Sequence, residues 1–276
     1  MEGSLTTIRC DQGSRLSASK SMCNFHRYSA YYDLLYRDKD YAAEAQYVAQ
    51  LIRSAVPTAR TILELGSGTG RHGRLLAAMG FDVHGIERSA EMVAVARAAA
   101  CAGSSGASGS FTCEVGDICR ASLGRVFDAV ISLFHVVSYQ TTNQALQAAF
   151  RVAADHLAPG GQFLFDVWHG PAVLSQRPSE RVKEVADERY RVKRTVRPEL
   201  DTNRGTVNVV YHMECEDRPS GKIVRFSEEH LMRYLFPTEV DLLARNCGLR
   251  QVASEEFLTG KPPSADSWGV LYILQK

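Results

Sequence analysis

The stretch Thr61-Ile-Leu-Glu-Leu-Gly-Ser-Gly-Thr-Gly-Arg-His-Gly73 indicates a buried strand that runs into a glycine-rich turn and then into a helix. Its apolar residues, at positions 62, 63 and 65, form the short run that is typical of a strand covered on both faces. Gly66, Gly68 and Gly70 allow the backbone to turn sharply and to come close to a ligand. The stretch therefore predicts a binding site for a nucleotide-type cofactor after the first strand.

Two kinds of cofactor suit a turn of this composition. The segment Gly68-Thr-Gly-Arg-His-Gly73 matches the dinucleotide fingerprint G-x-G-x-x-G, in which a helix N-terminus binds a pyrophosphate. The strand already ends at Leu65, however, so Glu64 lies two residues before the first glycine of the turn. A carboxylate there repels a pyrophosphate and favours a cofactor with a positive charge, such as the ammonium of a methionine moiety.

The pattern Glu64-x-Gly66-x-Gly68-x-Gly70 resembles the first signature, E-x-G-x-G-x-G, of the class I S-adenosylmethionine-dependent methyltransferases. Three later segments resemble the second, third and fourth strands of that family, in order: Phe81–Met92, Phe111–Ile118 and Phe127–Phe134. The resemblance implies a Rossmann-like α/β fold with a mostly parallel seven-stranded sheet. It also implies S-adenosylmethionine as the cofactor.

The resemblance assigns roles to the ends of these strands. Glu87 is placed to accept both hydroxyls of a ribose. Asp117 is placed near the adenine amino group and Ile118 against the adenine ring, and the fourth strand opens onto the methyl donor. The expected cofactor-binding residues are Tyr41, Glu64, Gly66, Ser67, Gly68, Gly70, Glu87, Arg88, Met92, Asp117, Ile118 and Leu133.

Composition and charge narrow the class of protein. The 276 residues suffice for one α/β domain with an appended element. The 32 basic and 31 acidic side chains nearly balance, so no overall field for nucleic acid or anionic lipid is expected. The seven cysteines contain no C-x-x-C pair and no apolar run approaches the roughly 20 residues of a membrane helix. We therefore expect a cytoplasmic protein with no metal site that binds neither nucleic acid nor a membrane.

Residues 1–24 are expected to be disordered, because they are rich in Ser, Thr and Gly and lack apolar periodicity. Met22 is a candidate for the true start. A single methyltransferase domain is expected over residues 25–276. The many tyrosines between Phe25 and Tyr41 form either a hydrophobic lid or a flap over the cofactor, and the sequence leaves both open.

The periodicity predicts the order of the remaining elements. Strands alternate with helices up to Trp168, which indicates a parallel sheet. After Trp168 the period changes to two, and an antiparallel β insert is expected within residues 177–235. Such an insert is placed to cover the active-site crevice or to pair two subunits as a homodimer. The expected elements are helices over 41–52, 70–79, 90–100, 143–156 and 237–246, a flexible loop over 102–110, and strands over 162–168, 189–197, 205–216, 222–234, 249–257 and 268–274.

The insert contains a group of basic side chains that suggests a surface for nucleic acid. Because successive side chains of a strand point to opposite faces, a solvated sheet face explains the group better. One or two of these side chains would also suit a phosphorylated substrate. The group comprises Arg177, Arg181, Lys183, Arg189, Arg191, Lys193, Arg194 and Arg197.

The acceptor of the methyl group is expected near the end of the fourth strand, in the segment Ser132–Tyr139. His135 and Tyr139 are four residues apart there, and either can orient or deprotonate an acceptor. The alternative for each is a hydrogen-bonded residue of the pocket wall. The segments Tyr32-Asp-Leu and Lys39-Asp-Tyr41, together with the insert, resemble the branch of the family that dimethylates nucleotide-linked deoxyaminosugars.

That second resemblance implies a small-molecule amine as the acceptor, with Tyr32 facing the amine. Tyr139 stands where that branch has a histidine, and His135 lies one helical turn earlier. The candidate catalytic residues are therefore Tyr32, His135 and Tyr139. Two alternatives remain: O-methylation of a sugar or phenolic metabolite with His135 as the base, and a noncatalytic cofactor-binding or NAD(P)-binding protein.

Overall fold

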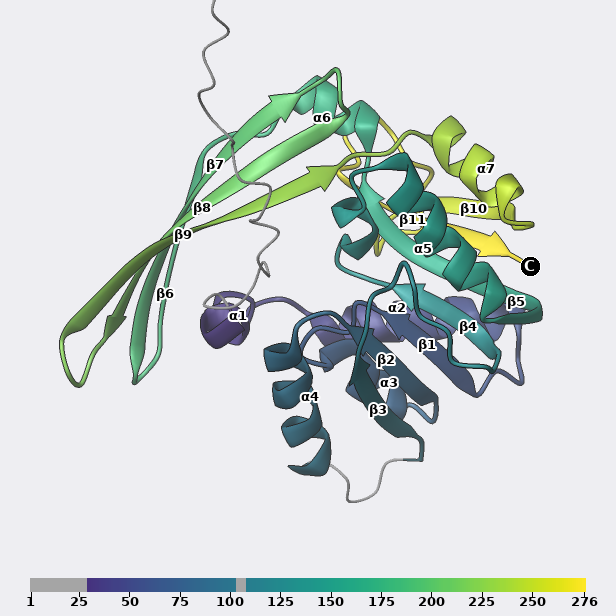
Figure 1. Ribbon diagram of the computed structural model, residues 1–276, viewed down its shortest axis with the longest axis horizontal. Coiled ribbons are helices and arrows are strands. Elements are labelled where there is room, and N and C mark those ends of the chain that lie inside the picture. The colour runs from purple at the N-terminus through teal and green to yellow at the C-terminus, as the bar shows by residue number, and fades with distance from the viewer. Residues whose placement is uncertain (1–28, 103–107) are drawn as a thin grey trace, which may run out of the picture.

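The computed structural model describes residues 29–102 and 108–276 (Figure 1). The N-terminal segment that was expected to be disordered, and the centre of the loop that was expected to be flexible, lie outside these residues. None of the helices within the described ranges is both long and apolar enough to cross a membrane.

The core is a seven-stranded sheet made of β1 (Thr61–Leu65), β2 (Asp82–Glu87), β3 (Ser110–Val115), β4 (Phe127–Ser132), β5 (Leu157–Trp168), β10 (Arg250–Glu256) and β11 (Gly269–Gln275). The strand order is β10-β11-β5-β4-β1-β2-β3. Only β11 runs against the others, because it pairs antiparallel with both β5 and β10. The predicted mostly parallel seven-stranded sheet is thus confirmed. Since the other strands are parallel, their carboxyl ends meet at one edge.

Helices cover both faces of this sheet (Figure 1). One face packs against α5 (Asn143–Asp155) and α7 (Pro237–Asn246), and the other packs against α2 (Tyr41–Ala55) and α3 (Arg71–Ala78). Leu63 of β1 belongs to the first cluster and its neighbour Ile62 belongs to the second. This two-sided burial explains why β1 is apolar along its length. The remaining core helix, α4 (Ala90–Ala102), packs against β2 and β3.

The insert is a separate four-stranded antiparallel sheet with the order β6-β7-β8-β9. It extends from the carboxyl edge of the core as a long curved arm (Figure 1). The antiparallel insert after β5 is therefore confirmed. Its strands are β6 (Arg181–Ala186), β7 (Tyr190–Asp201), β8 (Thr206–Asp217) and β9 (Lys222–Arg233).

The sequence analysis missed three features of this region. It missed β6, in which only Val185 is fully buried, so that charged residues hide the apolar alternation. It also missed the short helix α6 (Gly170–Gln176). Strand β5 begins at Leu157 rather than at residue 162, and its pairing with β4 is irregular between these positions, where Gly160 has a φ of 79° and apolar side chains are lacking.

The inner face of the insert packs on α1 (Ser29–Leu35), which lies between the insert and the core (Figure 1). Leu35 is fully buried there with Val192 and Met213. The Tyr31 ring meets the Tyr190 ring edge to face, with 5.3 Å between centroids. Helix α1 therefore packs against the insert and helps to connect it with the core.

Aromatic packing fixes α5 on the sheet. Phe150 is fully buried, and its ring lies 5.7 Å from Phe163 and 5.1 Å from Phe165, centroid to centroid. Replacing Phe150 with Ala should lower the free energy of unfolding by about 3–5 kcal/mol, because it removes a buried ring and leaves a cavity. Denaturant titration measures this value. Leu242→Ala, at a position of α7 that is 60% exposed, should change it by less than about 0.5 kcal/mol. Equal effects of the two variants would contradict this account of the core.

Candidate cofactor and acceptor site

The glycine turn after β1 requires its glycines for conformational reasons. Gly66, Gly68 and Gly70 have φ values of 82°, 54° and 73°, which L side chains rarely adopt. The N–H groups of Gly66 and Ser67 both donate to the carbonyl oxygen of Ile86, at 2.7 and 3.1 Å, and so tie the turn to β2. A side chain added at Gly68 would meet no atom within 4 Å. The backbone at Gly68 therefore borders open space, as the approach of a ligand requires.

Glu64 is a buried acid with unused hydrogen-bonding capacity. Its side chain lies inside the fold at the end of β1, where 2% of the residue is exposed. Its Oε2 atom has no hydrogen-bond partner among the described residues. Burial, and then the charge of Glu87, raise the pKa of Glu64 to about 8. A buried carboxylate of this kind fits the ammonium of a methionine moiety, because the cation would supply the missing charge and hydrogen bond.

Glu87 lies at the carboxyl end of β2, beside the turn. Its Oε2 accepts the N–H of Gly68 at 2.9 Å, and its Oε1 accepts the N–H of Ser89 at 2.8 Å. Burial raises the pKa of Glu87, although these backbone hydrogen bonds oppose the rise. Each carboxylate oxygen keeps a lone pair for another donor. The arrangement thus suits a pair of ribose hydroxyls.

The other expected cofactor residues follow the same edge of the sheet. Asp117 and Ile118 come directly after β3, and the Oδ1 atom of Asp117 accepts the N–H of Cys119 at 2.9 Å. The remaining ones differ in exposure: Tyr41, Ser67, Met92, Ile118 and Leu133 are buried, whereas Arg88 and Asp117 are exposed. Leu133 packs in the core cluster beneath α2, so it can only support the site from behind.

A buried ionic cluster beside the turn was missed by the sequence analysis. Glu44 of α2 is hydrogen-bonded by Lys39 and by the Nε2 atom of His72, the latter at 2.7 Å. Burial alone would raise the pKa of Glu44, but these two partners outweigh it and hold that pKa below its ordinary value. The Lys39 ammonium also lies 4.5 Å from the ring centroids of both Tyr41 and Phe134. It therefore places a cation between the turn and the loop after β4.

That loop has a strained backbone. Phe134 and His135 have φ values of 66° and 61°, and two successive non-glycine residues in the left-handed region cost about 1–3 kcal/mol each. Asp166, near the end of β5, compensates this cost, because it accepts the His135 N–H at 3.2 Å with both oxygens. The His135 Nδ1 atom also lies 2.7 Å from Asp166 Oδ2. The sequence analysis missed Asp166, although a lone carboxylate in the apolar run 163–168 was a visible signal.

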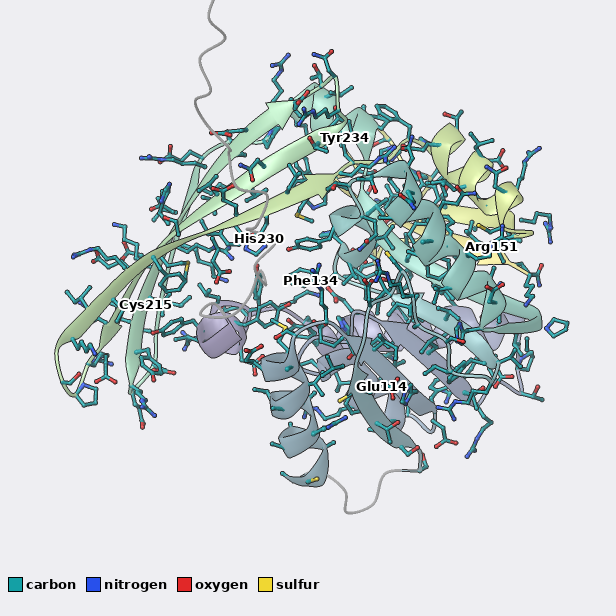
Figure 2. All side chains as sticks on the ribbon, viewed as in Figure 1. Glu114, Phe134, Arg151, Cys215, His230 and Tyr234 are labelled. Carbon is teal, nitrogen blue, oxygen red and sulfur yellow. The ribbon has the colours of Figure 1, made fainter. Side chains whose placement is uncertain are left out.

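Tyr139 has a different environment from His135, although either was expected to orient or deprotonate the acceptor. Its hydroxyl lies 3.1 Å from the Nδ1 atom of His230, on the inner face of β9. Burial, and then the charge of Arg194, lower the pKa of His230 to about 4, so that its imidazole is neutral. Burial raises the pKa of Tyr139 well above its ordinary value. Figure 2 shows Phe134 and His230 in the region between the core and the insert. The contact of Tyr139 with His230 connects these two parts.

Helix α1 connects the acceptor side with the glycine turn. The rings of Tyr32 and Tyr36 lie 6.5 and 5.0 Å from the Phe134 ring, centroid to centroid. The Asp33 carboxylate forms an ion pair with Arg71 at 3.0 Å and accepts a hydrogen bond from Thr69 at 3.3 Å. Tyr32 is thus near the loop that carries His135, and α1 covers the space between the turn and the insert.

The raised pKa of Glu64 gives a prediction for the ligand-free protein. Between about pH 4.5 and pH 8 the folded state keeps a proton on Glu64 that the unfolded chain has lost. The folded state binds more protons there, so its stability should fall by a few kcal/mol in total as the pH rises through this range. Glu64→Gln should remove this component of the pH dependence, as measured by denaturant titration at a series of pH values.

The exposed carboxylate of Glu188 provides the matched control. Glu188→Gln should retain the pH dependence of the unmodified protein. If Glu64→Gln also retained it, Glu64 would be ionised in the folded protein, and its assignment as an acid awaiting a cation would be wrong.

Comparison with known proteins agrees with this geometry. A family model described as a methyltransferase domain matches residues 62–161. The chain is 33% identical over 235 residues to the dTDP-3-amino-3,4,6-trideoxy-alpha-D-glucopyranose N,N-dimethyltransferase of Streptomyces venezuelae, a match that covers 84% of this chain and 92% of that enzyme. Streptomyces venezuelae DesVI has a similar structure, with a TM-score of 0.74 at 28% identity over 90% of this chain and 97% of that one.

A second solved structure is CalS10, described as an amino pentose methyltransferase from Micromonospora echinaspora involved in calicheamicin biosynthesis. Its TM-score is 0.70 at 28% identity, over 92% of this chain and 98% of that one. The similarity to these proteins runs through most of the chain. The chain belongs to the class I S-adenosylmethionine-dependent methyltransferases.

Proposed function

We propose that this methyltransferase acts on the amine of a small molecule, and that the acceptor is an amino sugar linked to a nucleotide. The observation that carries the proposal is the extent of the match to the Streptomyces venezuelae N,N-dimethyltransferase, which spans 92% of that enzyme rather than its cofactor half alone. Membership of the family sets aside the NAD(P)-binding alternative.

The cofactor has a consistent set of partners in this proposal. Glu64 pairs with the ammonium of S-adenosylmethionine, Glu87 accepts the ribose hydroxyls, and Asp117 with Ile118 borders the adenine. The Lys39 ammonium, beside the Tyr41 and Phe134 rings, is placed for the methionine carboxylate. The cofactor supplies a methyl group activated by the sulfonium, so the protein mainly has to align the acceptor and exclude water.

The acceptor end is formed by aromatic rings and one inward-facing arginine. The rings of Tyr32, Tyr36 and Phe134 provide apolar surfaces that suit the faces of a sugar ring. Arg194 lies on the inner face of β7, where its guanidinium donates to the Tyr36 hydroxyl at 2.9 Å and lies 4.8 Å from the centre of the Tyr211 ring. Its charge and its position facing the core make it the candidate partner for a phosphate of the acceptor.

O-methylation is the second candidate, and the contact between His135 and Asp166 favours it. An amine with an ordinary pKa is partly deprotonated near neutral pH, but a hydroxyl is a poor nucleophile until a base takes its proton. An imidazole held by a buried carboxylate is the usual form of such a base. The loss of activity when His135 is replaced therefore distinguishes the two candidates.

The test compares His135→Asn with the unmodified enzyme on a nucleotide-linked amino sugar and on the same sugar with a hydroxyl in place of the amine. Asn is chosen because it tolerates the left-handed backbone found at this position. With an amine acceptor, turnover should fall on the order of tenfold. With a hydroxyl acceptor it should fall by the roughly 10² to 10⁴ expected for loss of a general base. A thousandfold loss on the physiological acceptor, with unchanged affinity for S-adenosylhomocysteine, would replace N-methylation by O-methylation.

We further propose that the protein works in the cytoplasm without binding nucleic acid. The described thiols of Cys113, Cys119, Cys215 and Cys247 form no disulfide, which is typical of a reducing compartment. The basic side chains on the outer face of the insert are paired with carboxylates of the same face, which supports a solvated surface. These pairs are Arg191 with Glu216, Lys193 with Glu184, Arg197 with Glu180, and Arg225 with Glu214, at 3.5, 2.9, 3.6 and 2.7 Å.

We also propose that the outer face of the insert pairs with the same face of a second copy. Val182, Ile223 and Leu231 lie on that face and are 56%, 47% and 44% exposed. Four ion pairs within this face offset much of its charge, which would limit the repulsion between two copies. In this arrangement the second copy does not contact the inner face of the insert, which packs on α1 and borders the acceptor site.

Leu231→Asp should convert the dimer to a monomer, because a charge would be buried at the contact without a partner. Light scattering after size-exclusion chromatography measures the mass. Val252→Asp, at a β10 position that is 37% exposed, should leave the mass unchanged. A monomeric unmodified protein at micromolar concentration would exclude the proposed pairing.

A further inference from the structure

The contact between His135 and Asp166 lies at the edge of the core, where the Asp166 side chain is buried. Asp166 is 1% exposed at the carboxyl end of β5, whereas the His135 side chain is 22% exposed. The carboxylate accepts the backbone N–H of His135 and lies at an ion-pair distance of 2.7 Å from its Nδ1 atom, although this ring contact does not have hydrogen-bond geometry. One buried side chain thus sets both the backbone conformation and the ring orientation of its partner.

The surroundings restrict the imidazole further. The Trp168 ring lies 6.3 Å from the His135 ring, centroid to centroid, at an interplanar angle of 68°. A methyl group at Gly269 would lie 3.5 Å from the Cε1 atom of His135, so β11 approaches the ring closely on that side. The Nδ1 and Cε1 edges are therefore occupied by the protein, and the exposed part of the ring is the one that bears Nε2.

The charge of Asp166 determines which ring nitrogen holds a proton. Burial would raise the pKa of this acid, but the neighbouring His135 and the charge of Lys39 outweigh burial and lower that pKa. Asp166 is consequently an ionised acceptor, which favours a proton on Nδ1 and leaves Nε2 with a free lone pair. We propose that Asp166 is the positioning residue that makes His135 the proton acceptor of methyl transfer. This inference rests on the proposed function, since it concerns the same acceptor site.

The step is balanced without any further reactant. The lone pair of the acceptor nitrogen or oxygen forms the bond to the methyl carbon, and the carbon–sulfur bond breaks with its electron pair remaining on sulfur. The proton of the acceptor passes to Nε2 of His135. Asp166 stays ionised and stabilises the imidazolium until the proton leaves to water. If one amine is methylated twice, His135 would accept the proton in each of the two steps.

The first measurement needs no acceptor. Nitrogen-15 NMR of selectively labelled histidines reports which ring nitrogen is protonated, and His135→Asn identifies the signal of His135. The protein bound to S-adenosylhomocysteine should show His135 protonated at Nδ1. Asp166→Asn should shift the population toward protonation at Nε2, because an amide can donate to Nδ1, and Asp166→Glu should restore the original form. An unmodified protein already protonated at Nε2, or an unchanged signal in Asp166→Asn, would overturn the proposal.

The second measurement is a double-variant cycle of turnover. If Asp166 acts through His135, then Asp166→Asn should lower kcat as far as His135→Asn does, to within about threefold, and the double variant should be no slower. KM and the affinity for S-adenosylhomocysteine should change by less than about twofold. Additive losses would show that Asp166 serves only the backbone, and the positioning role would then be wrong.

Asp128 provides the matched control for a purely structural carboxylate. It lies at the opposite edge of the sheet and accepts the N–H groups of Arg60 and Thr61 at 2.8 Å each. Asp128→Asn should lower the melting temperature and leave kcat and the His135 signal unchanged. The failure of the proposed function and the failure of this inference can be distinguished. If neither an amine nor a hydroxyl is methylated, the proposed function is wrong. The tautomer of His135 still tests whether Asp166 positions this residue.

Discussion

The burial of one parallel sheet on both faces is the constraint on which the rest of this structure depends. Apolar side chains such as Ile62 and Leu63 fill both faces of β1, so polar groups cannot be placed along the strand without large cost. They are placed instead where the strands end. Because all the core strands except β11 run the same way, these ends converge on one edge. The cofactor turn and the loop with His135 are neighbours for this reason.

The pKa values of two buried carboxylates at that edge are shifted in opposite directions. Glu64 lies without a cation, and burial with the charge of Glu87 raises its pKa to about 8. Asp166 has His135 at 2.7 Å and feels the charge of Lys39, and its pKa is lowered. The first acid lacks a positive partner, which a bound ligand can supply. The second already has one inside the protein. In our proposals, this difference separates a group that binds the cofactor, Glu64, from a group that positions His135, Asp166.

Methyl transfer requires that water is excluded from both the cofactor side and the acceptor side. The short helix α1 packs beside both of them. Helix α1 pairs Asp33 with Arg71 beside the glycine turn and packs Leu35 into the inner face of the insert. On the other side, the contact of Tyr139 with His230 connects the loop after β4 to β9. The two connections close the same region from different directions. The two hypotheses for the aromatic segment, a hydrophobic lid and a flap over the cofactor, both stay predictions.

The elements around the predicted cofactor site could be predicted from the sequence because the residues that indicate them lie close together in the chain. Glu64 and the glycines of the turn lie within seven residues, and their spacing predicted the turn, whereas the seven-stranded sheet was predicted from the resemblance to the family. Glu87 was predicted at the end of the second strand from the resemblance, and the structure places it at the end of β2. The antiparallel insert was predicted where its strands alternate, and β6 was missed where charged residues interrupt the alternation.

Only the tertiary structure decided the acceptor side. Asp166 and His135 are 31 positions apart, and Tyr139 and His230 are 91 apart, so no spacing rule connects them. Sequence analysis placed His135 and Tyr139 together because they are four residues apart, but the strained backbone at Phe134 and His135 directs one to the core and the other to the insert. Local patterns determine which elements form and where a turn must open. Contacts between distant strands depend on how those elements pack, and that information is distributed over the whole chain.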